Sequence, residues 1–160
     1  MEKLSSEAFV DKSKMSLFGA SQGGVVASLY AAAYPDRVHK LMLIFPAFVL
    51  FDDAKETYRE LGSPDFDQLP DSLTHHNAAL GKIYLIDALD IDIQAEQTKI
   101  TAPTLIIHGT DDAVVPYQYA VQASQTIPNA ELVTVEGGEH RIDERFAITA
   151  APAIQKFLKE

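Results

Sequence analysis

The sequence predicts an α/β fold built on a mostly parallel sheet with flanking helices. Short β-rich runs alternate with longer helical runs along the chain, and this alternation is typical of βαβ units. One of the short runs, residues 40–45, is apolar almost throughout, as strands covered on both faces are. Because 160 residues suffice for one domain with its own core, we expect a single domain over residues 1–160.

The first part of the pattern is a strand, a helix and a second strand. The first strand is predicted over residues 15–18, and an Ala-rich helix over residues 22–34 follows it. Pro35 ends this helix, because the residue before a proline disfavours the helical conformation. The second strand is the apolar run over residues 40–45.

The regular alternation stops from residue 48 to about residue 98. This stretch is rich in acidic residues, contains Gly62, Pro64 and Pro70, and has only weak periodicity. A connection of this length inside a compact domain is more often a functional insertion than a structureless loop. We therefore expect an inserted cap over residues 48–98.

The alternation returns in the last third of the chain. A strand is predicted over residues 104–108, a helix over 117–126 and a further strand over 131–135. The last segment, 143–159, has the apolar spacing of an amphipathic helix. Pro152 should kink or restart this helix, because proline lacks the N–H that the helix interior requires.

Composition and charge exclude several classes of function. The 13 Lys and Arg against 23 Asp and Glu give a net charge of −10, which argues against nucleic-acid binding. The longest apolar stretch, residues 41–51, is too short to span a bilayer, and residues 1–14 show no signal-peptide pattern. The absence of cysteine excludes disulfides and thiolate metal sites. We expect a soluble, cytoplasmic protein that binds neither nucleic acid nor membranes.

A GxSxG motif lies between the first predicted strand and the first predicted helix. Residues 19–24 read Gly-Ala-Ser-Gln-Gly-Gly, with Ser21 at the centre. A serine in this sharp strand-to-helix turn needs small neighbours, and the turn presents its hydroxyl at the carboxyl end of the sheet. The backbone N–H of Gln22 would then be one oxyanion donor. The alternative is that Ser21 only caps the helix.

Two later loops carry the partners that a nucleophilic serine needs. The serine requires a base and a group that orients the base, in the chain order Ser, Asp or Glu, His. Asp111 and Asp112 follow the predicted strand 104–108, and His140 follows the predicted strand 131–135. An aspartate at a strand end is also a common turn or capping residue, and His140 has the alternative of a surface-loop histidine.

The remaining histidines are expected to be structural or exposed, and they are His39, His75, His76 and His108. The adjacent pair of histidines lacks carboxylates at a spacing that suits a metal ion. We therefore predict neither a metal site nor a cofactor.

Four segments together resemble the cinnamoyl (feruloyl) esterases of the α/β-hydrolase superfamily. They are Gly19-Ala-Ser-Gln-Gly-Gly-Val-Val-Ala-Ser-Leu-Tyr-Ala, Tyr34-Pro-Asp, His108-Gly-Thr-Asp-Asp-Ala-Val-Val-Pro and Glu136-Gly-Gly-Glu-His. The resemblance runs from about Lys14 to the C-terminus. It implies a partial α/β-hydrolase fold and the hydrolysis of small carboxylic esters, including hydroxycinnamate esters, through an acyl-serine intermediate. The spacing in this family selects Asp112 as the acid, with Ser21 as nucleophile and His140 as base.

The resemblance also implies residues that bind the substrate. In such enzymes the cap presents an aspartate and a tyrosine to the phenolic ring of the acyl group. Asp53 and Tyr84 fall at those positions, whereas Glu60 stands where a glutamine is expected. The residues alone explain Tyr84 equally well by helix packing within 82–89.

One departure from the family concerns the beginning of the chain. A full α/β-hydrolase domain has several strands before the serine turn, and one of its early loops supplies a second oxyanion donor. We therefore expect an N-terminally truncated domain whose first strand leaves one sheet edge exposed. Truncation, a homo-oligomer that covers the edge, and a degenerate relative are the three explanations. The alternative function is an impaired hydrolase fragment that oligomerises or binds a partner, and the same fold also serves peptidases and lactone hydrolases.

Overall fold

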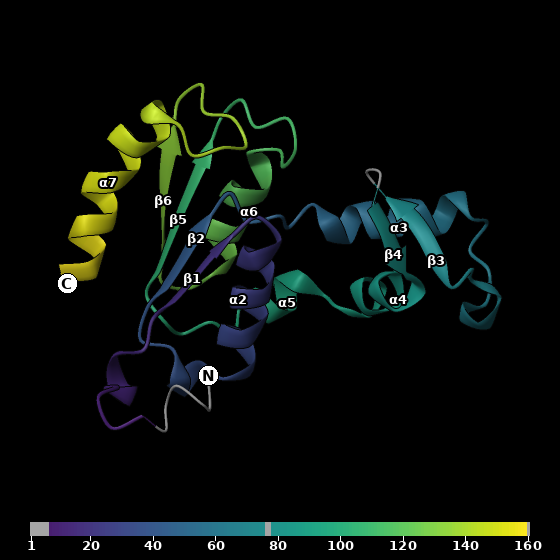
Figure 1. Cartoon of the computed structure of the whole chain (residues 1–160), viewed down its shortest axis with the longest axis horizontal. Helices are drawn as coiled ribbons and strands as arrows, with labels where there is room; N and C mark the ends of the chain where they lie inside the picture. Colours follow the sequence, from purple (N-terminus) through teal and green to yellow (C-terminus); the bar gives the residue numbers. More distant parts are fainter. Residues whose placement is uncertain (1–6, 76–77, 160) are drawn as a thin grey trace. The chain divides into compact units, whose positions relative to one another are not determined.

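The computed structural model describes residues 7–75 and 78–159, which divide into two compact units (Figure 1). The first unit comprises Met1–Phe48 and Gln94–Glu160, and the second comprises Val49–Ile93. The segment expected as a cap, residues 48–98, contains the second unit.

The described part of the first unit contains a four-stranded parallel sheet. Its strands are β1 (Leu17–Ala20), β2 (Leu41–Ile44), β5 (Thr104–Gly109) and β6 (Ala130–Val135), in the order β1-β2-β5-β6. Every neighbouring pair of strands is parallel. The predicted mostly parallel sheet is therefore confirmed, and each strand lies within two residues of its predicted position.

Helices cover both faces of this sheet (Figure 1). Helix α2 (Gln22–Ala33) packs against β1 and β2, α6 (Gln118–Thr126) against β5 and β6, and α7 (Glu144–Lys159) against β5 and β6. Short helical segments connect the elements: η1 (Lys12–Lys14), η2 (Pro35–Arg37) and α5 (Ile93–Gln97). The three longer helices agree with the predicted helices to within one residue.

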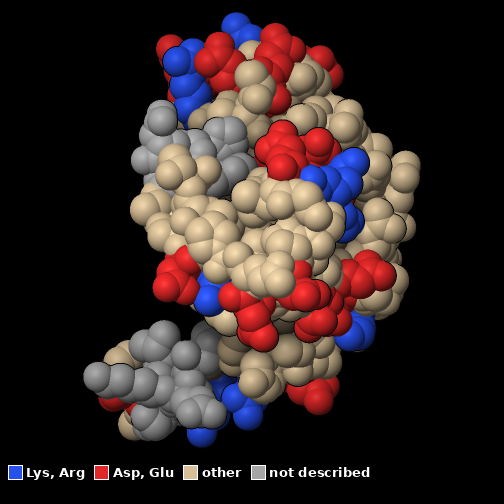
Figure 2. Space-filling model, turned by 90° about the vertical axis from the view of Figure 1, so that its right-hand side faces the viewer, with Lys and Arg blue, Asp and Glu red and all other residues tan. Residues whose placement is uncertain are grey.

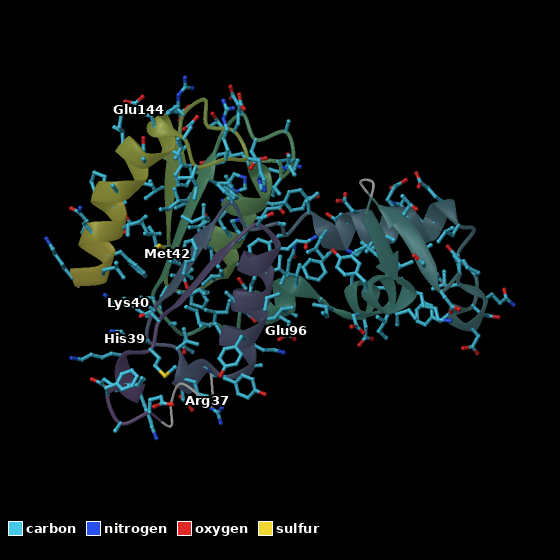
Figure 3. The ribbon with its side chains drawn as sticks, in the orientation of Figure 1. Arg37, His39, Lys40, Met42, Glu96 and Glu144 are labelled. Atoms are coloured by element: carbon cyan, nitrogen blue, oxygen red, sulfur yellow. The ribbon has the colours of Figure 1, made fainter. Side chains whose placement is uncertain are left out.

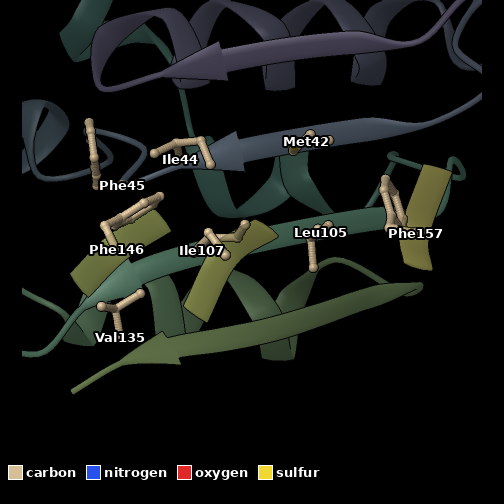
Figure 4. Packing of buried hydrophobic residues seen from close by; sticks show 9 residues of the cluster. Met42, Ile44, Phe45, Leu105, Ile107, Val135, Phe146 and Phe157 are labelled. Carbon is tan, nitrogen blue, oxygen red and sulfur yellow. The ribbon is translucent and has the colours of Figure 1, made fainter. Parts of the chain in front are cut away.

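Alternating residues of the central strands form two apolar layers. One layer faces α7 and is shown in Figure 4; it consists of Met42, Ile44, Phe45, Leu105, Ile107, Val135, Phe146, Ala150 and Phe157. Leu41, Leu43 and Ile106 point the other way and are fully buried. Burial on both faces explains why residues 40–45 are apolar almost throughout.

Helix α7 runs as one helix through Pro152, so the predicted restart does not occur. Proline at this position leaves the carbonyl of Ile148 without its usual donor, and Ile148 is exposed to water. Lys40, which is labelled in Figure 3, is buried. At the helix end it donates from Nζ to the carbonyl of Phe157 at 2.5 Å. A cation at a helix C-terminus satisfies a carbonyl and interacts favourably with the helix dipole.

The second unit is a small α+β arrangement. Helix α3 (Leu50–Glu60) contacts α4 (Lys82–Asp90), and β3 (Ser72–His75) pairs antiparallel with β4 (Ala78–Gly81). The short helix η3 (Phe66–Gln68) precedes the hairpin. The buried residues of the two longer helices are Phe51 and Ala54 in α3 and Leu85 and Ala88 in α4. Apart from a helix over residues 82–89, the sequence predicted no element in this unit.

The surface carries side chains of both charges. On the face drawn in Figure 2, basic side chains lie among acidic ones. Two of the ion pairs at the surface are Lys55–Asp52 at 3.1 Å and Lys82–Asp71 at 2.8 Å. Strand β1 lies at an edge of the described sheet, and its Phe18 is 61% exposed. Within residues 7–75 and 78–159, no helix is both long enough and apolar enough to cross a membrane.

Candidate active site

Ser21 occupies a sharp turn between β1 and α2. Its backbone has φ 52° and ψ −125°, a strained conformation for a residue with a side chain. Two flanking segments hold this turn: Ser21 N–H donates to the carbonyl of Ile44 at 3.0 Å, and Ala47 N–H donates to the Ser21 carbonyl at 3.0 Å. Ile44 is the last residue of β2, and Ala47 lies in the turn that follows it. The serine turn is therefore fixed to the neighbouring interior strand β2.

The side chains of Ser21, His140 and Asp112 form a continuous hydrogen-bonded chain. Ser21 Oγ lies 3.0 Å from His140 Nε2, and His140 Nδ1 lies 2.7 Å from Asp112 Oδ2. In the part of the chain that the structure describes, the Ser21 side chain makes no capping hydrogen bond to α2. The geometry thus favours the nucleophile interpretation of Ser21 over the capping alternative.

Asp112 is positioned by its own turn. Its side chain is fully buried, and Oδ1 accepts hydrogen bonds from Val114 N–H at 2.9 Å and Val115 N–H at 2.8 Å. Its neighbour Asp111 is exposed and accepts from the hydroxyl of Thr110 instead. Of the two candidate acids, the structure therefore places Asp112 beside His140.

The loops that carry Asp112 and His140 are joined by hydrogen bonds. Asp111 N–H donates to the carbonyl of Gly138 at 2.9 Å, and Gly137 N–H donates to Thr110 Oγ1 at 2.8 Å. At Gly109 a Cβ would lie 2.1 Å from the carbonyl oxygen of Gly138. Only a glycine permits this approach, so the two loops after β5 and β6 hold each other in register.

Phe45 contacts His140 and was predicted only as the end of a strand. Its ring centroid lies 4.4 Å from that of His140 and 5.7 Å from that of Phe146. The Phe45 backbone has φ 34°, a conformation that side chains rarely adopt. The residue type carries no signal for this conformation, because it arises from the junction of β2 with the turn that follows.

His108 is a second residue at the site whose role the sequence did not indicate. It is fully buried, so of the two expected alternatives, structural or exposed, the structure supports the structural one. Its Nε2 lies 2.9 Å from the carbonyl of Val115 and 3.2 Å from Asp112 Oδ2. A histidine four residues before the candidate acid, at the end of an otherwise apolar strand, is the signal that was available. Among the other histidines His39 is exposed, His76 lies outside the described residues, and the side chain of His75 is not described.

Gln22 is the first residue of α2. Its side chain is exposed, and the first N–H groups of a helix have no acceptor within the helix. The N–H of Gln22 directly follows the serine, as the oxyanion role predicted for it requires. Within residues 7–75 and 78–159, no group of three or more His, Asp or Glu side chains is arranged to hold a metal ion.

Asp53 and Tyr84 lie around one small pocket in the second unit. Its other lining residues are mostly apolar: Leu50, Ala54, Thr57, Leu73, Leu80, Gly81 and Leu85. Burial, and then the negative charge of Asp53, raises the pKa of the Tyr84 hydroxyl. Glu60, at the end of α3, is exposed. The structure thus brings Ser21, His140 and Asp112 together in the first unit, and Asp53 and Tyr84 together in the second.

Replacing Gly19 with alanine is expected to lower the free energy of unfolding by about 3 kcal/mol, as overpacking of rigid atoms does. A Cβ at Gly19 would lie 2.3 Å from the carbonyl oxygen of Gly23 and 2.7 Å from Cα of Gly24, and backbone atoms cannot turn aside. Gly23→Ala is the matched control, because its Cβ would meet nothing within 4 Å. Urea denaturation measures both variants, and equal midpoints would contradict the close approach.

Several known proteins with similar sequences are named as hydrolases. A model of the prolyl oligopeptidase family matches residues 1–160. Serine hydrolase BPHL of Mus musculus is 26% identical over 162 residues, covering 91% of this chain and 55% of that protein. AB hydrolase superfamily protein YisY of Bacillus subtilis is 28% identical over 157 residues, covering 78% of this chain and 59% of that protein. The chain thus spans little more than half the length of these relatives.

Solved structures give the same picture. Est1E from Butyrivibrio proteoclasticus superposes with a TM-score of 0.85 at 30% identity, over 98% of this chain and 64% of that one. A structure of Est1E with ferulic acid bound gives 0.83 at 30% identity, over 98% and 62%. These matches confirm the predicted α/β-hydrolase fold, and the match of the family model to the whole chain shows that it belongs to the prolyl oligopeptidase family of α/β-hydrolases.

Proposed function

We propose that the chain is the catalytic part of a serine carboxylesterase that acts on small acyl esters through an acyl-serine intermediate. The observation that carries the proposal is the chain of hydrogen bonds from Ser21 Oγ through His140 to the buried Asp112, with distances of 3.0 and 2.7 Å. Three residues far apart in the sequence meet in the order that nucleophilic catalysis requires. The likeness to Est1E supports an ester as the substrate.

In the acylation step, a proton moves from Ser21 to His140 and then to the leaving alcohol. His140 Nε2 accepts the proton of Ser21 Oγ as that oxygen attacks the ester carbonyl carbon. The π electrons of the carbonyl move onto its oxygen, which becomes the oxyanion. The N–H of Gln22 donates to that oxyanion, while the Asp112 carboxylate orients the imidazole and stabilises its cationic form. The intermediate then expels the alcohol oxygen, which takes the proton from His140 Nε2, and the acyl group remains on Ser21.

Deacylation repeats these steps with water. His140 removes a proton from a water molecule, whose oxygen attacks the acyl carbonyl carbon. The second intermediate breaks the bond to Ser21 Oγ, and that oxygen recovers the proton from His140. The products are a carboxylic acid and the regenerated hydroxyl of Ser21.

The direct test is hydrolysis of p-nitrophenyl butyrate by the purified chain, together with labelling by a fluorophosphonate. We expect release of p-nitrophenol, and a mass increase of one adduct that peptide mapping locates on Ser21. A peptide p-nitroanilide measured in parallel tests the peptidase alternative. A folded chain in which Ser21 stays unlabelled would contradict the proposal.

The alternative is a partner-binding hydrolase fragment, and the edge position of β1 with its exposed Phe18 favours it. This alternative requires a stable dimer or complex that lacks esterase activity. Size-exclusion chromatography with light scattering separates the two, because an active monomer contradicts it.

Within this class of esters, we propose that the acyl group is a hydroxycinnamoyl group. Asp53 and Tyr84 are polar groups in an otherwise apolar pocket, and a carboxylate that accepts a hydrogen bond from a phenol suits the ring of such a group. The ferulic acid in the Est1E structure supports the same class of ligand.

Replacing Asp53 with leucine is expected to lower kcat/KM for methyl p-coumarate about 10-fold, because the phenol loses its acceptor. The value for methyl cinnamate, which lacks only the phenolic hydroxyl, should stay unchanged. Asp52→Leu serves as the control, because Asp52 is exposed on the same helix. Equal losses for both esters would assign Asp53 to the folding of its unit instead of the recognition of the ring.

A further inference from the structure

His108 lies beneath the candidate triad, at the end of β5. Its imidazole is fully buried, and Nε2 points at two acceptors, the Val115 carbonyl at 2.9 Å and Asp112 Oδ2 at 3.2 Å. Asp112 Oδ2 is also the atom that faces His140 Nδ1. One carboxylate oxygen therefore lies between two imidazoles, one buried and one at the site.

The protonation state of His108 follows from its partners. Both neighbours of Nε2 are acceptors, so Nε2 must carry a hydrogen. Nδ1 is buried and has no hydrogen-bond partner among the described residues, so a hydrogen there would be an unpaired donor. The neutral imidazole with its hydrogen on Nε2 is therefore the favoured form, because it supplies a donor to the two acceptors and places no unpaired donor at Nδ1.

Burial favours the same neutral form. Burial lowers the pKa of His108, against the carbonyl of Val115 and the carboxylate of Asp112, which favour the charged form. His140 opposes protonation of His108 as a second potential cation. The other neighbour is Tyr117, whose ring centroid lies 6.0 Å away and edge-on.

The remaining contacts show what His108 holds in place. Asp112 Oδ1 accepts two backbone N–H groups of its own turn, from Val114 and Val115, whereas Oδ2 accepts from the two imidazoles. The single N–H of His108 therefore closes the turn at the Val115 carbonyl and restrains the oxygen that receives the hydrogen bond of His140. Without that donor, Oδ2 would lose one of the two groups that fix the carboxylate plane.

We infer that His108 is a positioning residue of the triad, which acts as a neutral donor from Nε2 to hold Asp112 Oδ2 in line with His140. The inference deepens the proposed esterase function and rests on it for its effect on turnover. The sequence predicted only a structural or exposed histidine at this position. The inference adds that His108 aligns the candidate triad.

Two variants separate the donor from the bulk of the side chain. His108→Gln retains an N–H group near the position of Nε2, whereas His108→Leu removes it, and His39→Leu is the control at an exposed histidine. For His108→Leu we expect kcat to fall about 10-fold with KM unchanged, the size of one hydrogen bond to a charged group. His108→Gln should stay near the wild type.

Imidazole NMR gives a readout that does not need turnover. Long-range ¹H–¹⁵N spectra of the wild type should show His108 with its hydrogen on Nε2 at neutral pH. The chemical shift of the His140 Nδ1 hydrogen should change in His108→Leu, because its acceptor oxygen loses a competing donor. The same chemical shift should stay unchanged in His108→Gln and His39→Leu. A hydrogen on Nδ1 of His108, or equal losses in both His108 variants, would overturn the inference. An inactive wild type with the expected spectra would instead refute only the esterase proposal. If His108→Leu fails to fold, the tautomer of His108 in the wild type still tests the inference.

Discussion

Replacing Ser21 with alanine is expected to lower kcat for p-nitrophenyl butyrate about 10⁶-fold, the loss typical of removing the nucleophile of a serine hydrolase. The hydroxyl that lies 3.0 Å from His140 Nε2 forms the covalent bond in the proposed mechanism, so no acyl intermediate can form without it. The backbone strain at φ 52° belongs to the turn, and alanine tolerates it about as well as serine does. Steady-state release of p-nitrophenol measures the effect.

Ser28→Ala is the matched control for this variant. Ser28 lies on α2, is buried, and donates from Oγ to the carbonyl of Gly24 at 2.8 Å, so its replacement removes one hydrogen bond within the helix. We expect Ser28→Ala to retain wild-type turnover. Activity of Ser21→Ala within a factor of about 10 of the wild type would require another nucleophile, since loss of the true one costs far more.

The sequence predicted the strands that are buried on both faces. The strand over residues 40–45 and the strand before Gly109 are apolar because helices cover both sides of them, and such runs are visible without a structure. The serine turn was equally visible, because Gly19 is required where strand β1 approaches helix α2, and Gly24 where that helix approaches Pro46. These signals are local, and each depends on a short stretch of sequence.

The second unit was not predictable in the same way. Strands β3 and β4 have four residues each, and their residues show no clear alternation of apolar and polar side chains. Helix α3 begins with Asp52 and Asp53 in its first turn and carries few apolar residues, so its short apolar face is easily missed. Its packing against α4 decides its place, and that contact is tertiary.

The site shows the same division between local and tertiary information. The chain order of Ser21, Asp112 and His140 could be obtained from motifs, whereas the contacts of Phe45 and His108 with them depend on how loops return to the sheet end. The turn after Asp112 folds back so that Val115 bonds both Asp112 and His108. No pattern of residue types in the strand indicates that return.

Asp112→Asn is expected to lower kcat about 10⁴-fold, because an amide in place of the carboxylate no longer stabilises the imidazolium and favours the wrong tautomer of the base. The amide nitrogen would face His140 Nδ1–H as a donor if it occupied the place of Oδ2, now 2.7 Å away. If it occupied the place of Oδ1, it would instead oppose the N–H groups of Val114 and Val115. Either orientation breaks one set of hydrogen bonds, and kcat for p-nitrophenyl butyrate reports the loss.

Asp111→Asn makes the same chemical change one residue earlier in the chain. Asp111 is exposed and accepts from Thr110 Oγ1, a bond that an amide oxygen can also accept, so turnover should stay at the wild-type level. The pair of variants therefore tests position alone, because both remove one negative charge from the same loop. If the two lost activity equally, the charge of the loop would matter and the contact of Asp112 with His140 would not. A selective loss in Asp112→Asn follows only if that buried contact orients the base.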